Sequence, residues 1–177
     1  EAKDINSYDY AIIAVGAHNM EMPIPHDNSN IVSSWDVLNG QEVTGDCVVI
    51  GGGLVGAETA EYLANKGHQV TIVEMMDKIA AGESTTVLPL MMKDFADHNV
   101  KQLVNTKVDH IENNIVYTAN EQIKADTIIN ALGSKKNIFD DSSITIPHVC
   151  VGDCSGERTA DIASAIRTAY KAANEIG

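Results

Sequence analysis

Short apolar runs separated by glycine-rich and polar breaks predict alternating strands and helices. Cys47-Val-Val-Ile50 is one such run, and Val70-Thr-Ile-Val-Glu74 is another. Between them, a glycine-rich turn precedes an expected helix over Leu54–Lys66, and Gly67 follows as its C-cap. Continuous apolar runs are typical of parallel strands that are buried on both faces. The pattern therefore predicts a βαβ unit and places the chain in the α/β class.

Further apolar runs predict strands on both sides of this unit. Residues 8–16 predict a buried parallel strand that ends at Gly16, and residues 126–132 predict a strand that ends at Gly133. Pro23, Pro25 and the polar residues 27–30 predict loop structure before the βαβ unit. Short β-rich pieces are expected at residues 102–104, 108–111, 115–118, 123 and 145–152.

Two more helices are expected. One begins at the cap residue Ser84 and ends near Asp97, and the other spans Thr159 to Ile176. Apolar residues recur in the second helix at three- and four-residue steps, which predicts one buried face. That face consists of Ile162, Ile166, Ala169, Ala173 and Ile176.

Composition and charge narrow the function classes. The 177 residues are 44% hydrophobic and 21% charged, which is typical of a globular protein with a sizeable core. The formal net charge of -13 excludes nucleic acid and an anionic membrane surface as expected partners. No apolar run is long enough to span a membrane. An anionic ligand would therefore be held by local backbone dipoles.

Three cysteines, at positions 47, 150 and 154, do not form a disulfide framework, and no signal-peptide pattern opens the chain. We therefore expect a cytoplasmic protein. Cys150 and Cys154 are expected to be small buried thiols, because their spacing is not that of a redox-active C-x-x-C and no second pair completes a metal site. The methionine pairs 75/76 and 91/92 are expected to fill the core.

Gly51-Gly-Gly-Leu-Val-Gly56 matches G-x-G-x-x-G between a predicted strand and a predicted helix, where each glycine has a physical task. Gly51 allows the tight turn, Gly53 lets the backbone approach a pyrophosphate, and Gly56 lets the helix pack closely on the strand. The helix N-terminus offers free N–H groups and a favourable dipole to phosphates. The motif predicts a Rossmann-type dinucleotide site.

Glu74 ends the second strand of the βαβ unit, where an acidic residue accepts hydrogen bonds from the adenosine ribose. Its carboxylate would repel a 2′-phosphate, and neither Met75 nor Met76 supplies an arginine. NAD(H) is therefore preferred over NADP(H). The alternative is a solvated carboxylate beside a structural turn. The complete set of expected NAD contacts is Gly51, Gly52, Gly53, Leu54, Val55, Gly56, Glu74, Met75 and Gly133.

The order of motifs resembles the two-dinucleotide flavoprotein family, in which an NAD-binding domain is inserted into an FAD-binding domain. Ala14-Val-Gly16 and Ala131-Leu-Gly133 resemble the two hinges, and Val151-Gly-Asp153 resembles the motif that binds the FAD ribityl chain. The C-terminal region from Val151 to Ala173 is most similar to that of Old Yellow Enzyme-like NADH:flavin oxidoreductases, such as dienoyl-CoA reductase, enoate reductase and trimethylamine dehydrogenase relatives.

This resemblance implies three segments. Residues 1–45 would be part of the FAD-binding domain and the crossing, 46–133 the Rossmann-type NAD-binding domain, and 134–177 the C-terminal part of the FAD-binding domain. In the parent protein, FAD would contact Gly16, Gly152 and Asp153. Asp153 has the alternative interpretation of a turn residue after a strand.

The first FAD-binding βαβ unit of the family has no counterpart in the chain, so we expect a fragment of a longer protein. Its missing N-terminal partner would supply the rest of the FAD site, and in Old Yellow Enzyme-like proteins also an FMN barrel with an iron–sulfur cluster. We expect homo-oligomers, because the partial FAD-binding domain would expose apolar surface and a strand edge.

The resemblance implies that the chain is the NAD(H)-binding portion of an FAD-dependent NADH oxidoreductase. Glu58 matches an acidic residue that the wider family places near the nicotinamide, although an acidic side chain in the first helical turns also needs no function beyond the dipole. The alternatives are a fragment of a flavin-linked disulfide or quinone reductase, and a non-catalytic NAD-binding module that senses redox state.

Overall fold

A five-stranded parallel sheet with the strand order β3-β10-β4-β5-β6 forms the centre of the larger of two units. The computed structural model describes residues 2–82, 86–156 and 162–176. The register places Val49 of β4 beside Ile72 of β5 and Ile129 of β10. The five strands are β3 (Ile31–Ser33), β4 (Cys47–Ile50), β5 (Val70–Val73), β6 (Lys101–Leu103) and β10 (Thr127–Asn130).

The two faces of this sheet are both covered, which explains the continuous apolar runs. All four residues of β4 are buried. Cys47 and Val49 belong to one hydrophobic core, whereas Val48 and Ile50 belong to the other. Successive strand residues point to opposite faces, so a strand between two cores must be apolar at every position.

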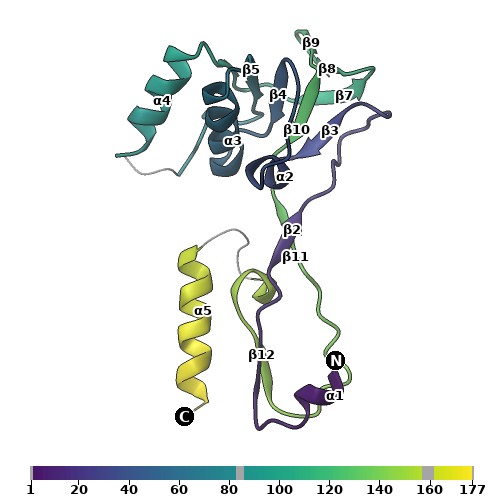
Figure 1. The fold of residues 1–177 in the computed structure, drawn as a ribbon, viewed down its shortest axis with the longest axis vertical. Helices are drawn as coiled ribbons and strands as arrows, with labels where there is room; N and C mark the ends of the chain where they lie inside the picture. The colour runs from purple at the N-terminus through teal and green to yellow at the C-terminus, as the bar shows by residue number, and fades with distance from the viewer. Residues whose placement is uncertain (1, 83–85, 157–161, 177) are drawn as a thin grey trace. The chain divides into compact units, whose positions relative to one another are not determined.

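Helices cover one face of the sheet (Figure 1). They are α2 (Ser34–Leu38), α3 (Leu54–Asn65) and α4 (Leu88–Asp97). Leu63 of α3 and Phe95 of α4 are buried in the core that these helices share with the sheet. Gly67 follows α3 with φ +92° and donates to the Ala64 carbonyl at 2.9 Å, as a left-handed C-cap should. The expected βαβ unit and α/β class are confirmed.

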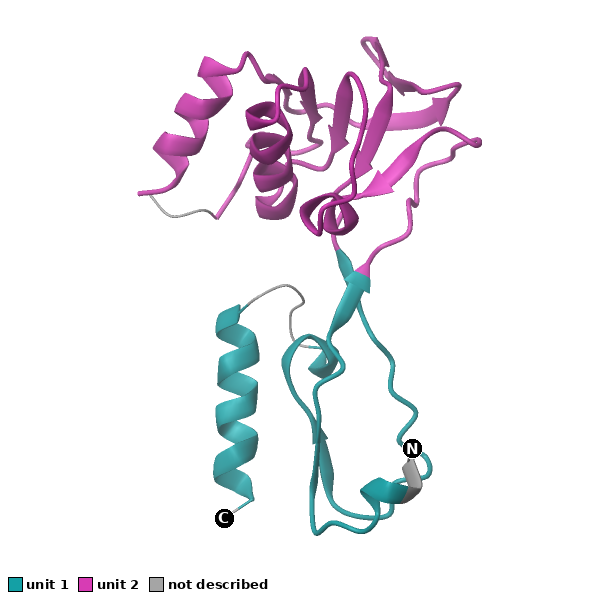
Figure 2. Ribbon diagram, in the orientation of Figure 1, with its two compact units in different colours: residues 1–18, 134–177 teal, residues 19–133 magenta. Residues whose placement is uncertain are grey.

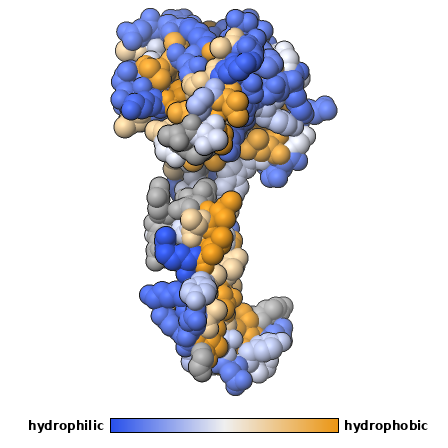
Figure 3. Space-filling model, turned by 90° about the vertical axis from the view of Figure 1, so that its left-hand side faces the viewer, coloured by the Kyte–Doolittle hydropathy of each residue, from blue (hydrophilic) through white to orange (hydrophobic). Residues whose placement is uncertain are grey.

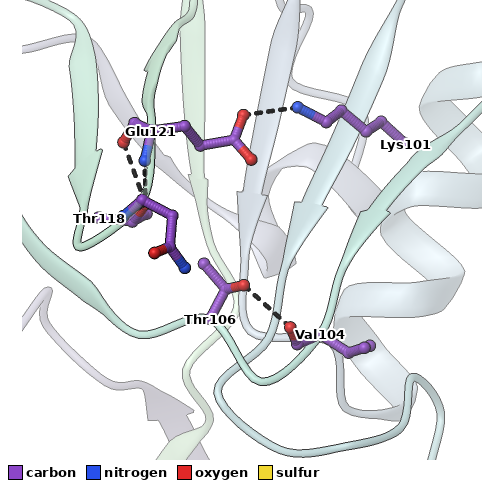
Figure 4. A network of polar contacts seen from close by, with 6 residues as sticks. Lys101, Val104, Thr106, Thr118 and Glu121 are labelled. Carbon is purple, nitrogen blue, oxygen red and sulfur yellow. Dashed lines mark hydrogen bonds and ion pairs between the residues drawn. The ribbon is translucent and has the colours of Figure 1, made fainter.

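A three-stranded antiparallel sheet, in the order β7-β8-β9, packs on the opposite face. Its strands are β7 (Val108–Glu112), β8 (Ile115–Thr118) and β9 (Gln122–Lys124). Val116 and Ile111 are buried against Ile128 of the parallel sheet. Figure 4 shows the Lys101 ammonium of β6 paired at 2.6 Å with Glu121, in the turn between β8 and β9. The pair is partly exposed, so packing rather than charge holds the layers together.

Residues 31–38 form β3 and α2, two elements that the sequence pattern did not predict. β3 is too short for a visible alternation, and it is fixed by pairing with β10. Ser33 caps α2 by accepting from the Asp36 amide. The larger unit therefore spans Asn19–Gly133, and residues 19–45 belong to it rather than to the segment that we expected to end at residue 45.

The smaller unit contains Glu1–His18 and Ser134–Gly177 (Figure 2). Its strands β1 (Ala11–Ile13) and β12 (His148–Cys150) pair in parallel, and β11 (Ser134–Lys136) pairs with β2 (Ala17–Asn19). Its helices are α1 (Ala2–Ile5), the 3₁₀ helix η1 (Gly152–Ser155) and α5 (Ile162–Glu175).

The strand expected over residues 8–16 is parallel but shorter and more exposed than predicted. Only Ile13 of β1 is buried, while Ile12 is 47% exposed. Ile13 joins Ile144 and Cys154 in a small hydrophobic cluster. A sheet of two strands offers neighbours on one side only, so it cannot bury a whole strand.

The prediction that α5 buries its apolar face is wrong. Ile162 is 80% exposed and Ile166 is 65% exposed, and the other three residues assigned to that face are exposed as well. The helix instead buries small residues, Ser164 and Ala172. Periodicity identifies an apolar face but does not supply a neighbour to cover it. Figure 3 shows hydrophobic side chains along the smaller unit, in the lower part of the view.

Ser84 and Thr159, the expected starts of two helices, lie outside the described residues, and the described helices begin at Leu88 and Ile162. No helix within residues 2–82, 86–156 and 162–176 combines the length and the hydrophobicity needed to cross a membrane.

Candidate dinucleotide-binding site

The segment Gly51–Gly56 joins β4 to the first turn of α3, and its geometry excludes larger side chains at its first and last glycines. Gly51 has φ +100°, and a Cβ there would lie 2.5 Å from the Ala131 carbonyl oxygen. A Cβ on Gly56 would lie 1.9 Å from the Gly51 carbonyl oxygen. The first glycine thus permits the turn, and the last permits close contact between α3 and β4.

Gly53 differs from these two, because a Cβ there would meet no atom within 4 Å. It is the N-cap residue of α3 and has no side chain to cap the helix. Free N–H groups at the start of a helix attract anions. The open space beside Gly53 therefore suits the close approach of a ligand phosphate to the backbone.

Glu74 follows β5 and is buried, with 9% of its surface exposed. Its Oε2 accepts a hydrogen bond from the Gly52 amide at 2.6 Å, and its Oε1 accepts from the Met76 amide at 2.7 Å. The solvated carboxylate that we considered as an alternative does not describe this side chain. Glu74 joins the carboxyl end of β5 to the glycine loop.

The Gly52 peptide is fixed from both sides. Its carbonyl accepts from the Ala80 amide at 2.7 Å, in addition to the hydrogen bond from its own amide to Glu74. A Cβ on Gly52 would lie 2.5 Å from Ile79 Cδ1 and 3.0 Å from Glu74 Cβ. A side chain at this position would displace the Ile79 side chain, so packing beneath the loop favours glycine there.

A cavity of about 540 Å³ opens at the carboxyl ends of β4, β5 and β10. This is the edge at which parallel α/β sheets bind ligands. The structure brings eight of the nine expected NAD contacts to the cavity wall, and Gly52 lies behind it. The eight are Gly51, Gly53, Leu54, Val55, Gly56, Glu74, Met75 and Gly133.

Thr106 and Lys107, which the sequence analysis missed, also line this cavity. Lys107 is exposed and is the basic residue among the described lining residues. Backbone hydrogen bonds hold their segment in place, from Asn105 to the Met76 carbonyl and from Thr106 to the Glu74 carbonyl, each at 2.8 Å. Figure 4 shows the Thr106 hydroxyl donating to the Val104 carbonyl. Thr106 and Lys107 follow β6 at the carboxyl edge of the sheet, and this position was the sequence signal that could have identified them.

The expectation for one methionine pair is wrong, and the expectation for Glu58 is untested. Met75 and Met76 are 64% and 60% exposed and line the cavity, so they do not fill the core as expected, because the chain leaves the sheet after Val73. Met91 is buried and Met92 packs against the core, as predicted. Glu58 is exposed on α3 and does not line the cavity, so its role near the nicotinamide stays a prediction.

The three expected FAD contacts line a cavity of about 430 Å³ in the smaller unit, next to Ala165 of α5. They are Gly16, Gly152 and Asp153. The Gly152 amide donates to the Thr168 hydroxyl at 2.8 Å, which joins α5 to the loop after β12. Gly16 and Gly152 have φ values of +70° and +67°, in the left-handed region that favours glycine.

The three cysteines are free thiols. Cys47 and Cys154 are buried, whereas Cys150 is only partly buried, so the expectation of buried thiols holds fully for Cys154 alone of the C-terminal pair. Among the residues described, no group of histidine, cysteine and acidic side chains could hold a metal ion.

Residues 2–172 match the model of the pyridine nucleotide-disulphide oxidoreductase family, and the chain belongs to this family. Its members are oxidoreductases that use FAD and NAD(H). The match covers both units, so the inserted α/β unit and the flanking segments belong to one family pattern.

Three similar proteins illustrate this membership. Bilirubin reductase of Mediterraneibacter gnavus is 44% identical over 177 residues, which covers 95% of this chain and 28% of that protein. Dihydrolipoyl dehydrogenase of Bacillus subtilis is 29% identical over 143 residues, which covers 77% of this chain and 31% of that protein. A structure of 2-naphthoyl-CoA reductase with 2-naphthoyl-CoA superposes with a TM-score of 0.80 at 26% identity. The match covers 96% of this chain and 27% of the reductase chain. The chain thus spans less than a third of each.

Proposed function

We propose that this chain is the NAD(H)-binding portion of an FAD-dependent NADH oxidoreductase. The observation that carries the proposal is the arrangement of Glu74 and the Gly51–Gly56 loop around one cavity at the carboxyl edge of the parallel sheet. An acidic residue on the second strand and an open helix N-terminus beside Gly53 suit the ribose and pyrophosphate of a dinucleotide.

The residues present fit the pyrophosphate and the adenosine ribose of the dinucleotide. The amides at the start of α3 would hold the pyrophosphate, with Lys107 adding a positive charge at the rim. Glu74 would accept hydrogen bonds from the ribose hydroxyls. Each of its carboxylate oxygens keeps a lone pair that the Gly52 and Met76 amides do not use. When bound, the cofactor pair supplies hydride transfer from the nicotinamide to the flavin, and the protein supplies position and orientation.

NADH should bind at least about tenfold more tightly than NADPH, which corresponds to about 1.4 kcal/mol. The reason is the buried carboxylate of Glu74 and the absence of arginine from the described lining residues. Calorimetric titration of the 177-residue chain with each nucleotide tests this preference. Equal or reversed affinities would overturn the assignment, and they would indicate that Lys107 recognises the 2′-phosphate.

For the longer protein, we favour an Old Yellow Enzyme-like NADH:flavin oxidoreductase that carries electrons onward to another flavin. The C-terminal resemblance from Val151 to Ala173 supports this choice, as does the similarity to two proteins named as reductases, of bilirubin and of 2-naphthoyl-CoA. Sequencing the gene upstream is the direct test. A barrel followed by an iron–sulfur motif would support the proposal.

A flavin-linked disulfide reductase is the second candidate, because the family carries that description and dihydrolipoyl dehydrogenase is among the similar proteins. Upstream sequence with a C-x-x-x-x-C pair and a glycine-rich βαβ unit, but no barrel, would favour this candidate. A redox-sensing module without catalysis is a weaker alternative, and a flavin in the longer protein that accepts hydride from NADH would count against it.

A further inference from the structure

The thiols of Cys150 and Cys154 are neighbours in the smaller unit. The Cys154 sulfur lies 3.3 Å from the Ile13 carbonyl oxygen and 3.2 Å from the Val151 carbonyl oxygen. Ile13 is the residue opposite Cys150 in the β1–β12 ladder. Cys154 belongs to a hydrophobic cluster against which Cys150 packs, and the Cys154 thiol contributes to the raised pKa of Cys150. The turn at Gly152 brings the two residues together.

Cys150 and Cys154 differ in their exposure to solvent. Cys154 is 6% exposed, whereas Cys150 is only partly buried at the end of β12. Burial, followed by the neighbouring Cys154 thiol and the Asp141 charge, raises the pKa of Cys150, and the Lys136 ammonium opposes this rise. His148 lies two residues before Cys150 and contacts Asp141 through Nε2 at 3.1 Å. Cys150 is thus the member that a small reagent can reach.

We propose that Cys150 and Cys154 form a dithiol site that closes to an intramolecular disulfide by exchange with a small disulfide of the glutathione type. In the first step, the Cys150 thiolate attacks one sulfur of the small disulfide, and the other half leaves as a thiolate that takes up the proton from Cys150. In the second step, the Cys154 thiolate attacks the Cys150 sulfur and releases the second half in the same way. The protein loses two hydrogen atoms, and the small disulfide is reduced to two thiols.

The same geometry gives the order of the two steps. The partly exposed Cys150 meets the reagent first, and the buried Cys154 lies in the cluster against which Cys150 packs, with its sulfur at the carbonyl of Ile13, the residue opposite Cys150. The ring that closes contains Gly152 and Asp153. If the proposed flavin site is correct, the state of the pair would change the loop that contributes to it, but the exchange itself does not require that proposal.

Cys47 should not take part. It lies in the larger unit, is 1% exposed, and burial together with the Asp46 and Asp126 charges raises the pKa of its thiol to about 11. A reagent cannot reach a thiol that is 1% exposed, so Cys47 cannot form the mixed disulfide with which the exchange begins. It therefore provides an internal control within the same chain.

The test uses the reduced 177-residue chain, incubated with oxidised glutathione over a pH series, with intact-mass measurement and peptide mapping. We expect a product that has lost two hydrogen atoms, carries no glutathione, and contains a Cys150–Cys154 cross-link. Its rate of formation should rise with pH, because the thiolate is the attacking form and the pKa of Cys150 is raised. Cys154→Ser and Cys154→Ala should each retain one glutathione at Cys150, while Cys47→Ala should close like the unmodified chain.

Three results would overturn the proposal: a stable glutathione adduct on the unmodified chain, a cross-link that includes Cys47 or a second chain, or no reaction of the folded protein. None of these readouts depends on NADH. A chain that binds NADH but fails to close the disulfide would overturn this inference alone, and a chain that closes the disulfide but does not bind NADH would overturn the proposed function alone.

Discussion

The Glu74 carboxylate accepts a hydrogen bond from the Gly52 amide at 2.6 Å, so the residue that we expect to bind the ribose also holds the glycine-rich loop. The other carboxylate oxygen is committed to the Met76 amide. Each oxygen retains a lone pair for a ribose hydroxyl. If Glu74 binds the ribose as we propose, the order of the loop and the recognition of the cofactor are coupled through one side chain.

Replacing Glu74 with alanine should affect the loop as well as cofactor choice. The substitution removes the acceptor of two amides, which should lower the free energy of unfolding by about 1–3 kcal/mol. NADH affinity should fall by about tenfold or more, and the preference over NADPH should narrow. Chemical denaturation and calorimetry measure both effects. The control is Glu112→Ala, at an exposed position of β7, which should change neither the free energy of unfolding nor the nucleotide affinities. A Glu74→Ala chain with unchanged stability would contradict the coupling between loop order and cofactor binding.

Alanine at Gly53 and at Gly56 should separate binding from folding. The Gly56→Ala methyl would collide with the Gly51 carbonyl, so the chain should lose about 3 kcal/mol of stability or fail to fold. The Gly53→Ala methyl has open space, so stability should change by less than about 1 kcal/mol. Its NADH affinity should nevertheless fall by about tenfold, because the methyl group occupies the space expected for the pyrophosphate. Unchanged NADH binding by Gly53→Ala would place the pyrophosphate elsewhere.

Arginine at position 76 should shift cofactor choice. Met76 is 60% exposed, lines the cavity and follows Glu74 closely, so a guanidinium there could pair with a 2′-phosphate. We expect NADPH affinity to rise by about tenfold, with little change for NADH. Met76→Gln adds a polar group of similar length without charge and should leave both affinities unchanged. Equal gains for both nucleotides in the arginine variant would point to the pyrophosphate as the group recognised.

The purified chain should be colourless and should oxidise NADH negligibly. It contains one glycine-rich βαβ unit, which we assign to NAD, and the expected FAD contacts in the smaller unit account for only part of a flavin site. The absorbance spectrum after purification, before and after addition of FAD, measures this directly. Stoichiometric yellow protein would show that Gly16, Gly152 and Asp153 suffice to hold the flavin.

The chain should self-associate through the exposed apolar face of α5. Ile162 and Ile166 are largely exposed, and apolar patches of this kind usually find a partner. The net charge of -13 opposes association, but salt screens it within about 8–10 Å at physiological ionic strength. Light scattering over a dilution series should show dimers or larger species.

Ile166→Asp should shift this equilibrium toward the monomer. Ile138→Asp is the matched control, because Ile138 is 90% exposed in the same unit but lies outside α5. A strictly monomeric unmodified chain at tens of micromolar would contradict the prediction, and an equal response to both substitutions would place the interface elsewhere.

The sequence by itself determined the βαβ unit, the glycine loop and Glu74. These features are local: the spacing of apolar residues sets the strand and helix, and left-handed backbone angles favour glycine whatever lies around them. The limits of β4 and α3 are therefore close to those predicted. Strands β7 to β9 also lie where the sequence predicts short β-rich pieces, whereas their antiparallel pairing was not predicted.

The tertiary structure alone decided which side chains face the cavity and which surfaces stay exposed. Thr106 and Lys107 reach the cavity because β6 pairs with β5, and β3 exists because β10 provides its partner. The apolar face of α5 is exposed because the described chain packs on the small-residue face instead. Each outcome depends on segments distant in sequence, since burial is a property of neighbours and not of the residue that is buried.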